Sequence, residues 1–281
     1  MGVKTKFLYF VKQISRAVKE EKITKVIVPT DKDEILAGKN AVIVGGTGGI
    51  GLAIADTLRN SGCNVVITGR SQEKAEASAK KMGGENIRGA ALDISNIDQI
   101  RTRIPEIANM FDNSSIDILV NAAGVISTVD FLDVTEEQWD TLMDANLKGL
   151  FFTSQVVSKH MIEKGIKGHI LNISSASSLR PAWKPYQISK WAVNGFTKGL
   201  ADTLLPYGII CNGIAPGPVA TPMMKKEGDE SLYNPTNPAG RCAASEEIAN
   251  LALFLVSSMG DLVVGETYVI SGGGGTISYH K

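Results

Sequence analysis

The chain lacks the cysteine and histidine patterns that would hold a metal ion or a disulfide framework. Its three cysteines, Cys63, Cys211 and Cys242, are odd in number and far apart, and the three histidines form no ligand pair with them. A disulfide scaffold or zinc module needs closely spaced, paired cysteines. We therefore predict no bound metal and three reduced thiols in a cytoplasmic protein.

Two further absences narrow the class of protein. Basic and acidic residues balance at 29 each, so no net charge favours nucleic acid as a partner. No apolar run approaches the ~18 residues of a transmembrane helix.

A chain of 281 residues with 43% hydrophobic content can bury one large core. We predict one catalytic domain over residues 36–281, preceded by an appendage over residues 1–35.

The appendage has the pattern of a basic amphipathic helix followed by a short β-like run. Residues 1–25 contain seven Lys or Arg and two Glu, and Phe7, Phe10, Ile14 and Val18 recur at helical spacing. Such a helix can dock on its own domain or on a partner subunit, which we favour. The alternative is peripheral contact with an anionic membrane surface.

From Asn40 onward, short apolar runs alternate with helical patterns. The expected strands are 41–44, 64–68, 90–92, 116–120, a run ending at 174, 209–214 and 268–270. The expected helices are 50–59, 73–81, 97–110, a pair over 136–163, 186–205 and 246–257. Fully apolar strands separated by helices indicate a parallel sheet covered on both faces. The predicted fold is α/β, a doubly wound, Rossmann-like sheet in three layers.

A glycine-rich turn follows the first of these strands. The sequence Val42-Ile-Val-Gly45-Gly-Thr-Gly-Gly49-Ile-Gly51 reads as strand, turn and helix start. In this position, glycines let the backbone approach a pyrophosphate, which meets the free amides of the helix N-terminus. The turn therefore predicts dinucleotide binding.

A second motif, Tyr186-x-x-x-Lys190, follows the serine-rich stretch after the fifth strand. Residues four apart share one helix face, and an ammonium beside a phenol favours the phenolate. The pair could therefore exchange a proton near neutral pH. By itself the spacing is common in helices.

Together these motifs resemble the short-chain dehydrogenases/reductases, in the compact branch that includes the 3-oxoacyl-carrier-protein reductases. The likeness covers about Leu36 to Gly274. Its landmarks occur in the family's order: Gly45-x-x-x-Gly49-x-Gly51, Asp93, Asn121-Ala-Ala-Gly124, Asn146, the serines, Tyr186/Lys190, Ala215-Pro-Gly217, Asn237-Pro-Ala-Gly-Arg241 and the terminal glycines. Two features depart from the family: Val44 replaces a usual Thr, and the stretch between Ser175 and Tyr186 is shorter than is usual.

The resemblance implies a catalytic tetrad of Asn146, Ser175, Tyr186 and Lys190. Ser175 would stabilise charge on the carbonyl oxygen, Tyr186 would transfer the proton, Lys190 would lower the pKa of Tyr186, and Asn146 would hold a water that relays protons. Ser174 is an alternative to Ser175, which we prefer because the second serine of such a run usually faces the substrate.

The resemblance also implies a set of cofactor contacts. They are Gly45, Thr47, Gly48, Gly49, Ile50, Gly51, Arg70, Ser71, Asp93, Ile94, Asn121, Ala122, Gly124, Tyr186, Lys190, Pro216, Gly217, Val219 and Thr221. The second strand ends at Gly69-Arg70, without the carboxylate that would bind the ribose 2′-OH of NAD. An Arg suits the 2′-phosphate, so we predict NADP(H) in preference to NAD.

The predicted function is interconversion of a carbonyl and a secondary alcohol by a dimer or tetramer. Arg180, Lys184, Lys225 and Lys226 flank the expected opening and suggest an anionic substrate, although solvated cations would give the same pattern. Residues 222–240 read as a substrate lid with no fixed structure. The alternatives are a reductase for sugars or polyols, phosphorylated or not, and a protein that senses NADP without turnover.

Overall fold

The structure is a computed structural model that describes residues 34–221 and 232–277. The predicted N-terminal helix, the β-like run 23–28, and Lys225 and Lys226 lie outside the described residues. Leu36 is buried in the core and its backbone N–H donates to the carbonyl of Ser61.

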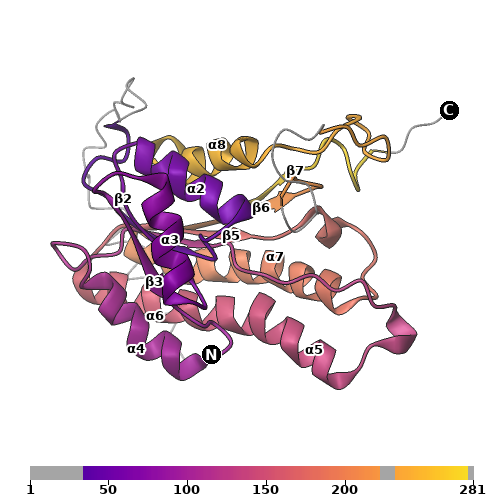
Figure 1. Ribbon diagram of the computed structural model, residues 1–281, viewed down its shortest axis with the longest axis horizontal. Helices are drawn as coiled ribbons and strands as arrows, with labels where there is room; N and C mark the ends of the chain where they lie inside the picture. Colours follow the sequence, from indigo (N-terminus) through magenta and orange to yellow (C-terminus); the bar gives the residue numbers. More distant parts are fainter. Residues whose placement is uncertain (1–33, 222–231, 278–281) are drawn as a thin grey trace, which may run out of the picture.

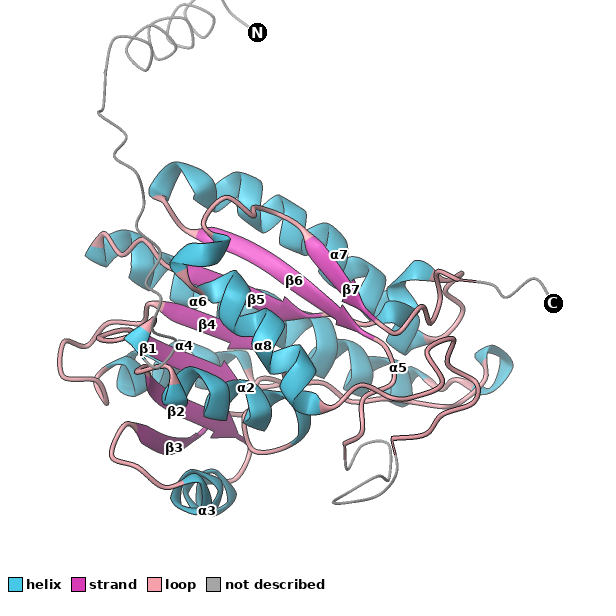
Figure 2. Ribbon diagram, turned by 90° about the horizontal axis from the view of Figure 1, so that it is seen from above, coloured by secondary structure: helices cyan, strands magenta, loops and turns pink. Residues whose placement is uncertain are grey.

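Strands and helices alternate in the predicted order (Figures 1 and 2). The strands of the described ranges are β1 (Asn40–Val44), β2 (Asn64–Gly69), β3 (Ile87–Ala91), β4 (Ile118–Asn121), β5 (His169–Ile173), β6 (Ile210–Pro216) and β7 (Thr267–Ile270). The α-helices there are α2 (Gly49–Asn60), α3 (Gln72–Met82), α4 (Ile97–Ala108), α5 (Glu136–Met143), α6 (Gly149–Lys164), α7 (Pro185–Leu204) and α8 (Ser245–Val256).

All strand pairs are parallel, in the order β3-β2-β1-β4-β5-β6-β7. The chain builds outward from β1 to β3, returns to β4 on the other side of β1, and then builds outward to β7. In such sheets the ligand crevice forms where the order reverses, at the carboxyl ends of the strands. Here that point lies between β1 and β4.

Side chains of successive strand residues enter opposite layers of the core, because a strand alternates its faces. Ala41 and Ile43 pack in the cluster that contains α2 and α8, whereas Val42 and Val44 pack in the cluster that contains α4, α6 and α7. Figure 2 shows α2 and α8 on one side of the sheet and α6 and α7 on the other. The predicted doubly wound fold in three layers is confirmed.

The glycine turn is held closed by two very close backbone approaches. Gly45 has a φ of +80°, and a Cβ built there would lie 2.6 Å from the backbone of Ala123. A Cβ on Gly51 would lie 2.3 Å from the carbonyl oxygen of Gly45. Only glycine fits at both positions, so the start of α2 sits directly against the end of β1.

The prediction that residues 222–240 lack fixed structure is wrong for residues 232–240. Asn234 N–H donates to Gly240 O, and Ala239 N–H donates to Gly272 O. The Asn237 side chain donates to the carbonyl of Ser271 at 2.9 Å. Asn and Pro were read as signs of an open loop, but here they form compact turns that pack on the C-terminal glycines.

Replacing Gly51 with Ala should destabilise the protein by about 1–3 kcal/mol, because its Cβ would overlap the Gly45 carbonyl. Gly48→Ala is the matched control: Gly48 has extended backbone and nothing lies within 4 Å of an added Cβ. That change should cost less than about 1 kcal/mol. Thermal unfolding of both variants measures the difference; equal shifts would contradict the close-approach argument.

Candidate active site

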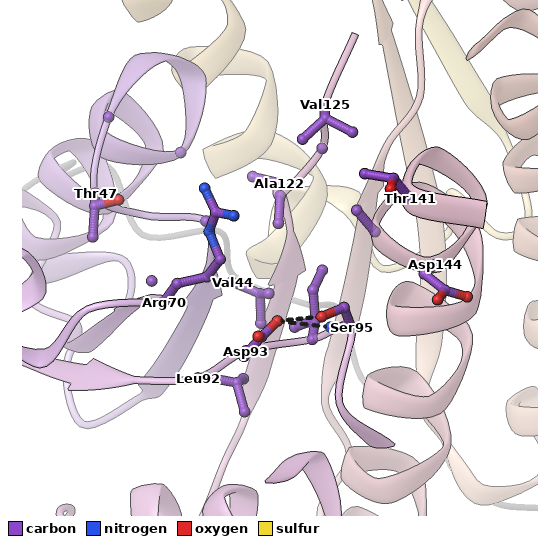
Figure 3. Close-up of a pocket in the computed structure, with 18 of the residues that line it drawn as sticks. Val44, Thr47, Arg70, Leu92, Asp93, Ser95, Ala122, Val125, Thr141 and Asp144 are labelled. Carbon is purple, nitrogen blue, oxygen red and sulfur yellow. Dashed lines mark hydrogen bonds between the residues drawn. The ribbon is translucent and has the colours of Figure 1, made fainter. Parts of the chain in front are cut away.

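The larger of two adjoining cavities lies at the carboxyl ends of β1, β2 and β4 (Figure 3). It has a volume of about 930 Å³, within the usual size of a cofactor site. Its walls include the glycine turn, Arg70, Asp93, Ile94, Ala122, Gly124 and Thr221, all of which were predicted to contact the cofactor.

The N-terminus of α2, which lies at this cavity, is suited to binding an anion. The N-cap of α2 is Gly48, which has no side chain to occupy the free N–H groups, and the first turn of α2 contains no acidic residue. A helix N-terminus with free amides and a positive dipole end binds phosphate groups. The residues present therefore fit the pyrophosphate of a dinucleotide.

Arg70 and Asp93 occupy different parts of the cavity (Figure 3). The Asp93 carboxylate accepts from the Ser95 backbone N–H at 3.0 Å and its hydroxyl at 2.7 Å, which fixes its orientation. Within the described part of the chain the Arg70 guanidinium makes no hydrogen bond or ion pair. It is thus available to a ligand at the end of β2.

The smaller cavity, of about 470 Å³, is lined by three of the four predicted catalytic residues, and Asn146 lies behind its wall at Val125. Ser175, Tyr186 and Lys190 line it together with Pro216, Gly217 and Val219. The two cavities share Ile50, Ala122, Gly124, Val125 and Thr221 in their walls. A ligand that fills the first cavity can therefore extend into the second.

Tyr186 is mostly buried and is hydrogen-bonded to Ser175. Burial raises the pKa of its phenol, and the hydrogen bond with Ser175 partly lowers it, so that the pKa lies above its usual value. Burial is the largest cause of this shift. The lowering of the Tyr186 pKa by Lys190, together with an oxidised nicotinamide, stays a prediction.

Lys190 is a buried ammonium group that donates a hydrogen bond to a backbone carbonyl. Its side chain is 5% exposed and its Nζ donates to the Ile173 carbonyl, at the end of β5, at 2.9 Å. The Nζ lies 5.9 Å from the centre of the Tyr186 ring. Desolvation lowers the pKa of Lys190 from 10.5 to about 8.

Asn146 lies in a π-helical turn, Asp144–Lys148, that joins α5 to α6. Such turns often mark functional sites. Its Oδ1 accepts from the Val125 N–H at 2.7 Å, and its Nδ2 donates to the Val125 carbonyl at 2.8 Å. Gly124 packs between Asn146 and Lys190: a Cβ there would lie 3.2 Å from Asn146 Oδ1 and 3.7 Å from Lys190 Nζ.

The two candidate serines have different partners. Ser174 donates from its hydroxyl to the Lys190 carbonyl at 3.1 Å, which ties the end of β5 to α7. Ser175 hydrogen-bonds Tyr186, and its hydroxyl accepts from the Ser177 N–H at 3.1 Å. These contacts favour Ser175 as the serine that acts on the substrate.

Two predicted cofactor contacts do not line either cavity. Asn121 is buried and donates to Ser154 at 3.0 Å and to Asn172 at 2.9 Å, so it holds β4 to β5 and α6. Ser71 accepts from the Lys74 N–H and caps α3. Both side chains satisfy the protein's own backbone and side chains instead of facing the cavity.

Lys184, which was predicted to flank the opening, is paired with a carboxylate. Its Nζ pairs with Asp130 at 2.7 Å and donates to the Thr128 carbonyl at 3.0 Å. Arg180, in contrast, lines the smaller cavity, and within the described ranges its guanidinium has no hydrogen bond or ion pair.

Sequence reasoning missed one wall of the larger cavity and part of the smaller one. The cavity side of α5 presents Glu137, Asp140 and Thr141 at helical spacing, and Asp144 follows at the start of the π-helical turn. Because α5 is polar on several faces, nothing in its sequence indicates which face lines a cavity. Asn237 lines the smaller cavity; its motif was noticed, but no role was assigned to it.

Fold and cavities define a dinucleotide-binding enzyme of the doubly wound α/β class, and comparison with known proteins gives the family. The family described as short chain dehydrogenase matches residues 39–232. Gluconate 5-dehydrogenase of Gluconobacter oxydans (strain 621H) is 34% identical over 246 residues, 85% of this chain and 95% of that protein. The 3-oxoacyl-[acyl-carrier-protein] reductase FabG of Aquifex aeolicus (strain VF5) is 35% identical over 85% of this chain and 98% of its own.

A solved structure agrees with these relatives. The gluconate 5-dehydrogenase from Burkholderia cenocepacia J2315, in complex with NADP and tartrate, has a TM-score of 0.79 and 35% identity, covering 88% of this chain and 99% of that one. The chain belongs to the short-chain dehydrogenase family. It is an oxidoreductase of the NAD(P)-dependent type that acts on CH–OH and C=O groups. No helix in the described ranges is long and apolar enough to span a membrane.

The depressed pKa of Lys190 predicts how stability varies with pH. Below pH 8 the lysine is protonated in both the folded and the unfolded state, so burial of its charge lowers the free energy of unfolding by a constant amount. Between pH 8 and 10.5 the folded state releases this proton while the unfolded state keeps it, so stability rises with pH. Relative to Lys190→Met, the wild type should gain up to about 3 kcal/mol across this range.

Denaturant unfolding of the wild type and Lys190→Met at pH 7, 8, 9 and 10 measures this gain. Lys198→Met is the matched control, because Lys198 is exposed on the same helix. Its difference from wild type should stay flat with pH. A flat difference for Lys190→Met as well would show that the buried lysine keeps an ordinary pKa.

Proposed function

We propose that the protein is an NADP(H)-dependent reductase that converts a ketone to a secondary alcohol with Asn146, Ser175, Tyr186 and Lys190. The observation that carries this proposal is the position of Tyr186. Its phenol interacts with the Ser175 side chain, and both residues line a cavity that shares walls with the dinucleotide-sized cavity. This arrangement supports a proton donor beside the end of a bound cofactor.

A bound nicotinamide supplies the hydride, and the protein's groups bind and polarise the carbonyl. Ser175 donates a hydrogen bond to the carbonyl oxygen, where negative charge develops. Tyr186 donates the proton to that oxygen. Lys190 places a positive charge near Tyr186, and Asn146 holds Val125 and thereby the wall shared by both cavities. The proton-relaying water assigned to Asn146 stays a prediction.

The raised pKa of Tyr186 keeps its phenol protonated at neutral pH, the form that can give a proton to a carbonyl oxygen. Because a raised pKa also makes the phenol a weaker acid, proton transfer needs positive charge beside it. We infer that Lys190 supplies this charge and that, in oxidation of an alcohol, an oxidised nicotinamide adds to it.

The proposed cofactor contacts are the predicted ones that line the cavities. The glycine turn from Gly45 to Gly51 receives the pyrophosphate, Asp93 and Ile94 with Ala122 and Gly124 flank the adenosine, and Pro216, Gly217, Val219 and Thr221 flank the nicotinamide. Arg70 selects NADP through the 2′-phosphate. The solved relative that was crystallised with NADP is consistent with this preference.

The substrate we propose is a small carbonyl compound that carries an anion. Relatives of similar identity are named for gluconate and for 3-oxoacyl-carrier-protein, so their names leave both a sugar-acid and an acyl reductase open. An NADP sensor without turnover is less well supported, because both Tyr186 and Lys190 line the cavity. The bound tartrate of the solved relative is a dicarboxylate and agrees with an anionic substrate.

We also propose a homodimer or homotetramer in the cytoplasm. Phe151 on α6 and Trp191 on α7 are 40% and 49% exposed, which supports burial of these helices against another copy. The three cysteines are free and buried, as expected in a reducing compartment. The N-terminal appendage, either as part of an interface or on a membrane surface, stays a prediction.

Tyr186→Phe tests whether the protein is an enzyme. Loss of the proton donor should lower kcat for NADPH-dependent ketone reduction by about 10²–10⁴-fold. NADPH binding, followed by fluorescence titration, should change less than about threefold, because the phenyl ring keeps the shape of the site. Equal NADPH oxidation by variant and wild type over a panel of ketones would contradict the assigned role.

Arg70→Ala tests the choice of nicotinamide. A bidentate contact between Arg and phosphate is charge-assisted, so its loss should raise the KM for NADPH about 10- to 100-fold. The KM for NADH should change little, since NADH has no 2′-phosphate. Arg101→Ala is the control, because Arg101 is exposed on α4 and paired with Asp98. An equal rise for both cofactors would refute the assignment.

A further inference from the structure

We propose that Arg180 determines substrate specificity by binding an oxyanion of the substrate, so that the enzyme prefers a small keto or hydroxy acid to a neutral carbonyl compound. This inference rests on the proposed reductase function of the same cavity. It assigns a second contact point for the substrate, in addition to the carbonyl oxygen at Ser175 and Tyr186.

Arg180 lies one short turn away from the catalytic serine. Ser175 caps a 3₁₀ turn, Ala176–Leu179, and Arg180 is the residue after it. Because a 3₁₀ helix rises about 2 Å per residue, the four residues of the turn advance the chain by only ~8 Å. Both Ser175 and Arg180 line the smaller cavity. The guanidinium is therefore near enough to hold one end of a short molecule whose carbonyl is at Ser175.

The charged side chains in the described wall of the smaller cavity are all positive. They belong to Arg180 and Lys190, and no carboxylate lines this wall. Lys190 is buried and donates to the Ile173 carbonyl, whereas Arg180 is exposed and its guanidinium has no ion pair among the described residues. Lys184, the other nearby cation, is neutralised by Asp130. Arg180 is thus the cation of this wall that is free to meet an anion.

The backbone that carries Arg180 is fixed to α7, the helix of the proton donor. The Trp191 indole N–H donates to the Arg180 carbonyl at 2.8 Å. The Asn194 side chain donates to the Ser178 hydroxyl at 2.8 Å, and that hydroxyl donates to the Ser175 carbonyl at 2.6 Å. These bonds set the distance from Arg180 to Tyr186, as a two-point substrate contact requires.

The Arg180 side chain lies beside the C-terminal glycines. Gly275 has a φ of +91°, and a Cβ there would lie 3.2 Å from Arg180 Nε. The side chain therefore packs along the glycine backbone, with neighbouring Gly274 in the wall of the same cavity. A packed arginine loses less freedom when it binds a planar carboxylate, for which its paired N–H groups are suited.

A carboxylate and a phosphate would both satisfy this site, and binding experiments can separate them. The full-length protein, saturated with NADP⁺, is titrated with tartrate, inorganic phosphate and threitol, the neutral four-carbon analogue of tartrate. Calorimetry gives each affinity, and thermal shift provides a second readout. We expect tartrate to bind and threitol to bind at least tenfold more weakly; phosphate binding comparable to that of tartrate would point to a phosphorylated substrate.

Arg180→Met removes the charge and keeps much of the side-chain length. It should weaken tartrate binding about 10- to 100-fold, as expected for loss of a charge-assisted contact, and leave the affinity for NADP⁺ unchanged. Arg180→Lys should retain part of the affinity. Arg101→Met, which removes an exposed arginine on α4, should behave as wild type. Equal tartrate affinity in wild type and Arg180→Met would overturn the proposal, as would threitol binding as well as tartrate.

Turnover separates this proposal from the proposed function. Wild type should reduce 5-keto-D-gluconate with a higher kcat/KM than D-fructose, and Arg180→Met should lose that preference while keeping its rate with the ketose. Reduction of both compounds with no effect of Arg180→Met on their ratio would refute the role of Arg180 but leave the reductase standing. Reduction of neither, with tartrate binding that depends on Arg180, would count against the reductase alone.

Discussion

The buried ammonium of Lys190 is the constraint around which the proposed active site is arranged. A charged group without solvent is costly unless it is hydrogen-bonded, and here the Ile173 carbonyl at the end of β5 accepts the bond. That bond requires α7 to lie directly over the end of β5, and the Ser174 bond to the Lys190 carbonyl holds the two elements together. The same burial lowers the pKa of Lys190 and raises that of Tyr186. Burial thus makes each charged form more costly, while at neutral pH the lysine keeps its proton.

Parallel strands explain why these groups meet the dinucleotide cavity. The carboxyl ends of β1, β4 and β5 lie side by side, so the glycine turn after β1 and the serines after β5 open toward one crevice. Asn146, in the turn between α5 and α6, completes this arrangement by binding both backbone groups of Val125. Residues from three distant parts of the chain thereby fix the wall that the two cavities share. Loss of one such bond would change the relative position of cofactor and proton donor.

Much of this could be predicted from the sequence, because the signals are local. Buried parallel strands are continuous apolar runs, and a glycine turn after the first strand has few other structural explanations. Asn121 was assigned to the cofactor from its motif, although the alternation of β4 already places it on the face of Leu119, toward α6. Ser71 directly precedes α3, where a serine commonly caps a helix. In both cases a general rule of local structure accounts for the side chain, and its contact with the cofactor stays a prediction.

Other features depend on contacts between distant residues and had no local signal. The pairing of Lys184 with Asp130 joins the start of α7 to the segment after β4, and it turns an apparently free cation into a neutral pair. The pKa of Tyr186 depends on burial by the whole fold, which the spacing to Lys190 does not reveal. The turns at residues 232–240 depend on the C-terminal glycines, through Asn237 and Ser271.

Separate parts of the structure carry chemistry and specificity. Tyr186 and Lys190 lie on a twenty-residue helix packed against the sheet, so their geometry is insensitive to changes at the cavity mouth. Arg180 directly follows a turn of four residues, and both are anchored to the same helix by Trp191 and Asn194. A longer turn would move the guanidinium relative to the carbonyl site without disturbing the proton donor. The length of this turn can therefore set which anion–carbonyl spacing the enzyme accepts, while the hydride and proton transfers stay the same.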